Sequence, residues 1–294
     1  MNAISHPFGG VETSSARSAA EIARSYQKDG LDWTTLLWTA CGFAAIAASS
    51  WAAWTGRWPL WAGFLTNMYF MFFIFGSQHE AAHNNIAHGR LAWINPVLGW
   101  LCGFVNLVPF RGWGDLHVLH HVHVNDPILD PDGWMNGKNP FNVIFRCMTI
   151  PPHYVYYYLS TKAYDKVRGG RISFVTLIAN WVIALGASGW MAAHGDLRLL
   201  ILWPISGYMC IFLSGIFFVW FPHYPREGRT RTDNATTYIF KGPAAWLMRV
   251  FDFWQSFHII HHAYPRVPFY RHGKLFHELR GHIEADGSEI IEVR

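Results

Sequence analysis

Four long uncharged stretches constrain what this chain can fold into more than any other feature. Residues 33–54, 58–77, 172–193 and 199–221 contain no Asp, Glu, Lys or Arg. Each is about 20 residues long, the length that an α-helix needs to cross a hydrocarbon layer roughly 30 Å thick. Charged residues make up only 14% of the chain, against about 25% in an average soluble protein. The sequence therefore predicts an all-α integral membrane protein with four transmembrane helices.

Short connections pair these stretches into two helical hairpins. Only Thr55-Gly56-Arg57 separates the first two stretches, and only residues 194–198 separate the last two. On this layout Arg57 and Arg198 are the only basic residues on the far side of the membrane. The positive-inside rule then places both termini and the polar regions in the cytoplasm, as in a bacterial inner-membrane protein.

The rest of the chain divides into a polar N-terminal segment and one membrane domain. Residues 1–30 are polar and cytoplasmic in this interpretation, and residues 31–294 form a single domain whose cytoplasmic cap comprises residues 78–171 and 222–294. The basic residues are scattered and no nucleic-acid motif accompanies them, so we expect no nucleic-acid partner.

Three histidine clusters lie in the predicted cap, just outside the apolar stretches. They are His79-Glu80-Ala81-Ala82-His83, His117-Val118-Leu119-His120-His121 and His258-Ile259-Ile260-His261-His262. Histidines three or four residues apart share one face of a helix, where two imidazoles can bind one ion. Eight histidines exceed the three or four protein ligands of a zinc site, so a pair of metal ions fits better. Nitrogen ligands are compatible with iron and disfavour magnesium and calcium, while zinc and copper stay open.

The histidine clusters also decide how residues 91–110 are interpreted. This uncharged stretch is long enough for a further span, but a full crossing would put His117 on the opposite side of the membrane from His83. Glycines and prolines interrupt it at Pro96, Gly99, Gly103 and Pro109. We therefore expect a re-entrant or interface-lying pair of short helices, with an ordinary third span as the alternative.

In their order and topology, the three clusters make the chain similar to the membrane fatty-acid desaturase and hydroxylase superfamily, from about Trp58 to His272. The resemblance implies a four-span helical fold with a cytoplasmic cap that holds two Fe²⁺ ions. It also implies O2 as co-substrate and removal of hydrogen from an unactivated C–H bond. The implied metal ligands are His79, His83, His117, His120, His121, His258, His261, His262 and, in Phe-Pro-His-Tyr-Pro, His223.

The substrate implied by the resemblance is a long apolar lipid, which the enzyme would desaturate or hydroxylate. Residues 120–132, 221–225 and 261–271 are similar to carotenoid β-ring hydroxylases and ketolases, so oxygenation of a carotenoid ring is the alternative. No fused electron donor is visible, because the chain lacks the cysteine spacing of a ferredoxin. An external ferredoxin or cytochrome with its reductase is therefore expected.

Several residues beside the clusters are candidates for hydrogen bonds to the ligands. The acidic candidates are Glu80, Asp115, Asp126 and Asp252. His88 and His123 are candidates either for metal ligands or for such outer contacts.

Residues 79–83 also match the HExxH signature of zinc proteases. In that hypothesis Glu80 would be the general base, and Asp130 or Asp132 a third zinc ligand. It leaves the two His-x-x-His-His clusters unexplained. A non-catalytic membrane scaffold that binds no metal is a further alternative.

Overall fold

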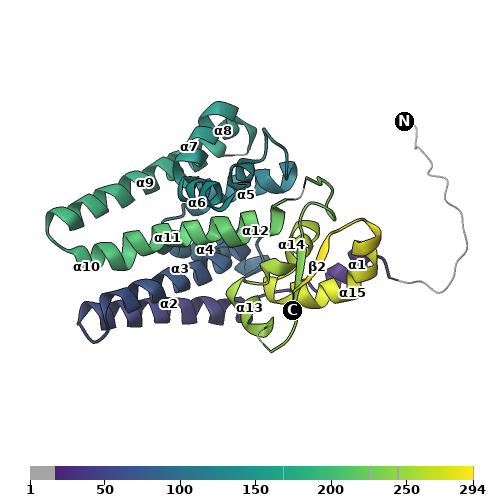
Figure 1. Cartoon of the computed structure of the whole chain (residues 1–294), viewed down its shortest axis with the longest axis horizontal. Helices are drawn as coiled ribbons and strands as arrows, with labels where there is room; N and C mark the ends of the chain where they lie inside the picture. Colours follow the sequence, from purple (N-terminus) through teal and green to yellow (C-terminus); the bar gives the residue numbers. More distant parts are fainter. Residues whose placement is uncertain (1–16, 168, 226, 244, 294) are drawn as a thin grey trace, which may run out of the picture.

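Long apolar helices form a bundle that carries a cap of short elements at one end (Figure 1). The computed structural model describes residues 17–167, 169–225, 227–243 and 245–293. The first 16 residues of the predicted polar N-terminal segment lie outside this described part.

The described part of the chain contains four helices long and apolar enough to cross a membrane, or five if one bent pair counts as a span. They are α2 (Trp33–Trp54), α3 (Leu60–Ala82), α9 (Gly170–Ala193) and the run Leu197–His223. That run comprises α10 (Leu197–Leu200), η3 (Ile201–Ile205), α11 (Ser206–Ser214), η4 (Gly215–Trp220) and α12 (Phe221–His223). The four predicted apolar stretches therefore form the four candidate spans. Helix α3 continues beyond Ser77 because Gln78, Glu80 and the alanines after it are good helix formers.

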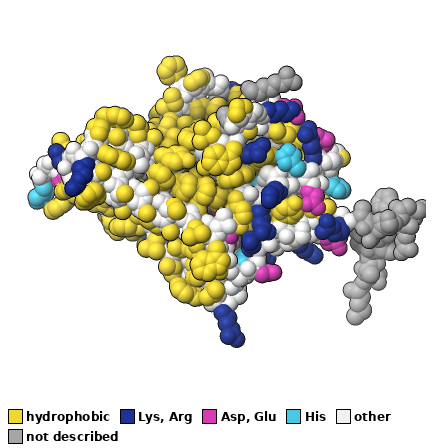
Figure 2. Space-filling view, turned by 90° about the horizontal axis from the view of Figure 1, so that it is seen from below, with side chains coloured by type: hydrophobic (Ala, Val, Ile, Leu, Met, Phe, Trp, Pro, Cys, Tyr) yellow, Lys and Arg dark blue, Asp and Glu magenta, His cyan; other side chains and the backbone are white. Residues whose placement is uncertain are grey.

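The two short turns of the bundle lie together at the end opposite the cap. Arg198, in α10, donates from Nη1 to the carbonyl oxygen of Trp54 at 2.8 Å. Nearer the bundle centre, Asn67 of α3 donates to the Leu202 carbonyl at 2.7 Å. Apolar side chains cover the flank of the bundle, while charged and histidine side chains gather mainly over the cap (Figure 2). This surface suits a bundle surrounded by lipid with a cap in water.

The bent pair consists of α4 (Ile94–Asn106) and α5 (Phe110–His123), which meet at 103°. Leu107 at the corner has φ +59°, and Pro109 precedes the first turn of α5. The prediction of two short helices within residues 91–110 was wrong in detail. That stretch holds α4 and the corner, and the second helix of the pair is α5, which carries the second histidine cluster.

Side chains from three other helical segments bind the free carbonyl groups of this corner. The bonds run from Trp203 Nε1 to Val105 O (3.1 Å), from Asn180 Nδ2 to Leu107 O (2.9 Å) and from Gln78 Nε2 to Val108 O (3.0 Å). Non-helical backbone at membrane depth is tolerated only where protein groups satisfy it. We call Gln78, Asn180 and Trp203 the corner donors.

The cap is built from short elements before α9 and after α12. The first part contains η1 (Gly89–Leu91), η2 (Pro131–Met135), α6 (Pro140–Met148), α7 (Ile150–Thr161) and α8 (Ala163–Lys166). The second contains α13 (Ala245–Phe251), η5 (Gln255–Phe257), α14 (His258–Ala263), η6 (Phe269–Arg271) and α15 (His272–Ala285), against which α1 (Ala19–Ser25) packs.

A small parallel sheet corrects the all-α prediction. Strands β1 (Thr237–Phe240) and β2 (Ile290–Val293) pair with Thr237 opposite Ile290. Both are rich in β-branched or aromatic residues, which favour extended backbone. With four residues each, they are too short for an alternating pattern to reveal them in the sequence.

Candidate metal centre

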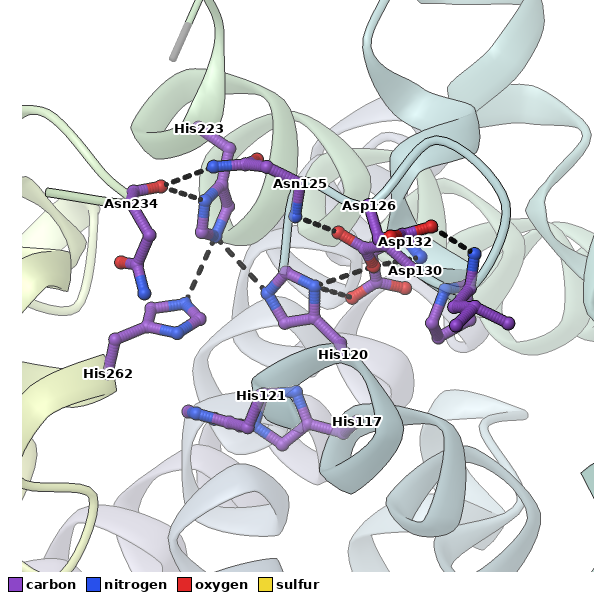
Figure 3. Close-up of polar contacts among 12 residues, drawn as sticks. His117, His120, His121, Asn125, Asp126, Asp130, Asp132, His223, Asn234 and His262 are labelled. Carbon is purple, nitrogen blue, oxygen red and sulfur yellow. Dashed lines mark hydrogen bonds and ion pairs between the residues drawn. The ribbon is translucent and has the colours of Figure 1, made fainter. Parts of the chain in front are cut away.

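Four separate segments bring the predicted histidines to the junction of bundle and cap. Helix α3 carries His79 in its last turn, and His83 is the residue that ends it. Helix α5 presents His117, His120 and His121. The third cluster occupies α14, and His223 ends α12 (Figure 3).

The nine histidines form two adjacent groups. The ligand atoms of His79, His83, His117 and His261 lie within 4.8 Å of one another, as do those of His120, His223, His258 and His262. His121 Nε2 lies 3.2 Å from His117 Nε2 and 2.9 Å from His261 Nε2, so it joins the former set. We call these five residues the first histidine group, and His120, His223, His258 and His262 the second histidine group.

The spacing within each group is that of ligands around a metal ion. Nε2 atoms are 2.9 Å apart in His83 and His117, 3.1 Å in His79 and His261, and 3.0 Å in His258 and His262. Metal–nitrogen bonds of about 2.0–2.1 Å at right angles place neighbouring nitrogens roughly 3 Å apart. When several imidazole Nε2 atoms point at one another, no arrangement of protons gives every one of them a hydrogen-bond partner. The residues therefore fit two bound cations, and the all-nitrogen donor set suits iron, zinc or copper.

Burial keeps the imidazoles of the third cluster neutral. It lowers the pKa values of His258, His261 and His262 well below the ordinary histidine range, and neighbouring imidazoles lower them further. Burial likewise lowers the pKa of His83 to about 3. A neutral imidazole offers a lone pair, so these residues need lose no proton to bind a metal.

Acceptors behind the second histidine group fix the orientation of three of its rings. His120 Nδ1 donates to Asp130 Oδ1 at 2.8 Å, and His223 Nδ1 donates to the Asn234 carbonyl at 2.9 Å (Figure 3). His258 Nδ1 donates to Gln255 Oε1. A proton held on Nδ1 turns the lone pair of Nε2 toward the centre of the group.

Most of the acidic residues proposed for this outer role bond elsewhere. Glu80 Oε1 lies 3.6 Å from His79 Nδ1. Asp126 accepts from the backbone of its own loop and pairs with Arg229. Asp252 accepts from the Ser256 backbone, and the buried Asp115 Oδ2 has no hydrogen-bond partner among the described residues. His88 and His123, which the sequence analysis proposed as ligands or outer contacts, belong to neither histidine group.

The acceptors that sequence reasoning missed are Asp130, Asn234 and Gln255. Asp130 was considered only as a zinc-protease ligand beside the first cluster, but it bonds His120 in the second histidine group. Asp132 Oδ2 is also near His120, at 3.9 Å from Nδ1. The protease hypothesis therefore loses its third ligand. The sequence did offer a signal for Asp130, because this residue lies ten positions after His120 in an Asp-Pro-Asp turn. Asn234 acts through its backbone carbonyl, which no sequence pattern marks.

An apolar cavity runs from the histidine groups into the bundle. It reaches His79, His117, His120 and His258 at one end. Its walls come from α3, α5, α9 and the α11–η4 segment, and include Phe75, Trp113, Leu177, Trp181, Ile211 and Phe218. A second opening reaches His83, His121 and His262, with Arg229 and Arg231 beside it. The groups are thus accessible from the apolar cavity and from this second opening.

The fold and the site define an integral membrane protein with a polyhistidine centre beside an apolar cavity. Residues 55–294 match the family model described as fatty acid desaturase, and the chain belongs to that family.

Three relatives are similar to most of the chain. It is 26% identical over 258 residues to the sn-1 oleoyl-lipid 12-desaturase of Anabaena variabilis, covering 86% of this chain. It is 26% identical over 263 residues to the protein of the same name from Picosynechococcus sp. (strain ATCC 27264 / PCC 7002 / PR-6), covering 85% of this chain. With the fatty acid desaturase of Bacillus subtilis (strain 168) it shares 24% identity over 238 residues, 71% of this chain. In each case the match spans 63% of the relative's length.

Proposed function

We propose that this protein is an O2-dependent membrane oxidoreductase that desaturates the acyl chain of a long-chain lipid, with two iron ions held by the nine histidines. The observation that carries the proposal is the convergence of these histidines, from four segments of the chain, at the end of an apolar cavity. Family membership and the names of the relatives support desaturation over hydroxylation or oxygenation of a carotenoid ring.

The proposed topology has residues 31–294 as one domain that crosses a bacterial inner membrane four times, in two hairpins. The bent pair α4–α5 enters and leaves on one side, so that both histidine groups and the termini are cytoplasmic. Two features support this topology: the turns at Trp54 and Arg198 lie together, away from the cap, and the basic residues gather on the cap.

The chain's own residues position the substrate and the ligands. The apolar cavity walls exclude water and hold an extended acyl chain, so that a C–H bond lies beside His79, His117, His120 and His258. The Trp113 ring is stacked on His117, with 13° between their planes, and restricts the rotation of that imidazole. When bound, the iron pair supplies, with dioxygen and two external electrons, the oxidising power that removes hydrogen from an unactivated C–H bond.

We propose that the electrons come from a separate protein, a ferredoxin or a cytochrome with its reductase. The net charge of +4 on the whole chain favours an acidic donor. The second opening, beside Arg229 and Arg231, is a route by which the donor could approach His83, His121 and His262.

Lipid analysis of cells with and without the protein tests the proposed reaction. We expect new double bonds in membrane acyl chains, and we expect His120→Ala and His261→Ala to abolish both the product and the bound iron. His194→Ala is the matched control, because His194 is exposed in the turn after α9 and, among the described residues, its side chain hydrogen-bonds only the Trp190 carbonyl. An unchanged acyl profile together with a newly oxygenated carotenoid would refute desaturation and support the alternative.

A further inference from the structure

The two histidine groups differ in how their outer nitrogens are held. Three of the four rings in the second histidine group donate Nδ1–H to an acceptor. Within the described residues, no ring of the first histidine group makes such a bond. His79 Nδ1 is 3.6 Å from the nearest carboxylate oxygen, that of Glu80, and His261 Nδ1 is buried without a partner. The first histidine group is thus oriented by packing, and the second by directed hydrogen bonds.

Asn125 joins two of the acceptors behind the second histidine group. Its backbone N–H donates to Asp130 Oδ2 at 2.8 Å, and its side-chain Nδ2 donates to the Asn234 carbonyl at 3.0 Å. Asp130 and the Asn234 carbonyl are the partners of His120 and His223 (Figure 3). A single residue therefore ties the loop after α5 to the loop after α12, and so links two ligands that lie 103 residues apart.

The acceptors are themselves fixed. Asp130 Oδ1 accepts from the Asp132 backbone N–H at 2.8 Å, and Asp132 accepts from the hydroxyl group of Tyr154 at 2.7 Å. Asn125 donates a further bond to the Gly228 carbonyl at 2.7 Å. The carboxylate and the carbonyl are thus in place before any ion arrives, which lowers the entropy lost when the ion binds.

The backbone at Asn125 restricts which residues could serve there. Its φ is +58°, a left-handed conformation that glycine adopts freely and that asparagine tolerates better than most other residues. Glycine could adopt the same backbone conformation, but it lacks the side-chain amide with which Asn125 reaches the Asn234 carbonyl. Asn125 therefore combines a turn with a cross-link.

We propose that the two metal positions are unequal. The second histidine group is the preorganised position, which binds its ion first and releases it last. Asn125 is the positioning residue that holds the acceptors of His120 and His223 in place. The inference rests on the metal centre of the proposed function. Hydrogen bonds to the outer nitrogen of a ligand typically change metal affinity about 10–100-fold. Three such bonds on one group and none on the other predict two classes of bound ion.

Release of Fe²⁺ to a chromogenic chelator, followed anaerobically on the full chain in detergent without substrate, tests the inference. We expect the wild-type protein to release its two ions in two phases that differ in rate at least about 10-fold. In Asn125→Gly the backbone turn and the bond to Asp130 are kept and the amide is lost. The slow phase should accelerate about 10-fold, while the fast phase keeps its rate and amplitude.

Asn84→Gly is the matched control. Asn84 also has φ +58°, follows His83 of the first histidine group directly, and is exposed. It makes no side-chain hydrogen bond to a described residue, so both phases should keep their wild-type rates. Gln255→Met removes the acceptor of His258 from a different element and should also accelerate only the slow phase.

Release of both ions in one phase by the wild-type protein would overturn the inference and leave the proposed function intact. An equal acceleration of both phases in Asn125→Gly and Gln255→Met would also overturn it, since the two positions would then behave as one unit. Failure of the wild-type protein to retain any Fe²⁺ would refute the metal centre itself, and with it the proposed function.

Discussion

Replacing Asn180 by Leu tests whether side chains from the bundle hold the corner between α4 and α5. Asn180 donates from α9 to the Leu107 carbonyl at 2.9 Å, and its replacement leaves that carbonyl without this donor. An unsatisfied buried carbonyl costs about 1–3 kcal/mol. At about 2–4 °C for each kcal/mol in a large domain, the midpoint of thermal unfolding should fall by roughly 2–12 °C.

Thermal unfolding of the detergent-solubilised protein measures this change. Ser188→Ala, on the same helix, is the control, because the Ser188 hydroxyl bonds only the Ala184 carbonyl one turn earlier. Its midpoint should stay near that of the wild type. If Asn180→Leu and Ser188→Ala unfolded at the same temperature, the view that the corner depends on a donor from α9 would be refuted.

Three further predictions concern the cavity, the metal centre and a buried acid. Ile211→Phe adds bulk to the cavity wall and should shift desaturation toward shorter acyl chains, as measured by product analysis across a series of chain lengths. An unchanged preference would show that the acyl chain does not follow this cavity. Removing metal with a chelator should abolish desaturation and lower the unfolding midpoint, because ions that bind only the folded state stabilise it; an unchanged midpoint would contradict the buried centre. Burial raises the pKa of Asp252 to about 7, above its unfolded value of about 4. The folded state therefore holds the proton more tightly, and stability is lost as pH rises from about 4 through about 7. Asp252→Asn should raise the unfolding midpoint relative to the wild type at pH 8 and not near pH 4, and an equal difference at both values would exclude this titration.

The candidate spans could be predicted from sequence because each obeys a local rule. Residues 33–54 are uncharged, and helix α2 occupies the same residues. The corner at Leu107 depends instead on Gln78, Asn180 and Trp203, whose hydrogen bonds join parts of the chain that are 30 or more residues apart. Such long-range partners leave no periodic pattern, so the bend was anticipated from the need to bring His117 to His83 and from the glycines and prolines within residues 91–110.

The grouping of the histidines was predicted only in part for a similar reason. The spacing of His117, His120 and His121 places them on one face of a helix, but it does not say which ion each of them would bind. In the structure His120 turns toward His223, while His117 and His121 turn toward His261 and His83. One cluster thus contributes to both groups, and this division depends on where α12 and α14 place His223 and His261 relative to α5.

The distribution of the nine histidines along the chain has a consequence for biosynthesis. His79 emerges from the ribosome with the second apolar helix, but His258, His261 and His262 emerge only after all four candidate spans have been made. Neither histidine group can close until that last segment has folded back onto the bundle. Metal uptake would then be a late step of maturation, because the centre stays incomplete in the newly inserted helices until residues 258–262 have been made.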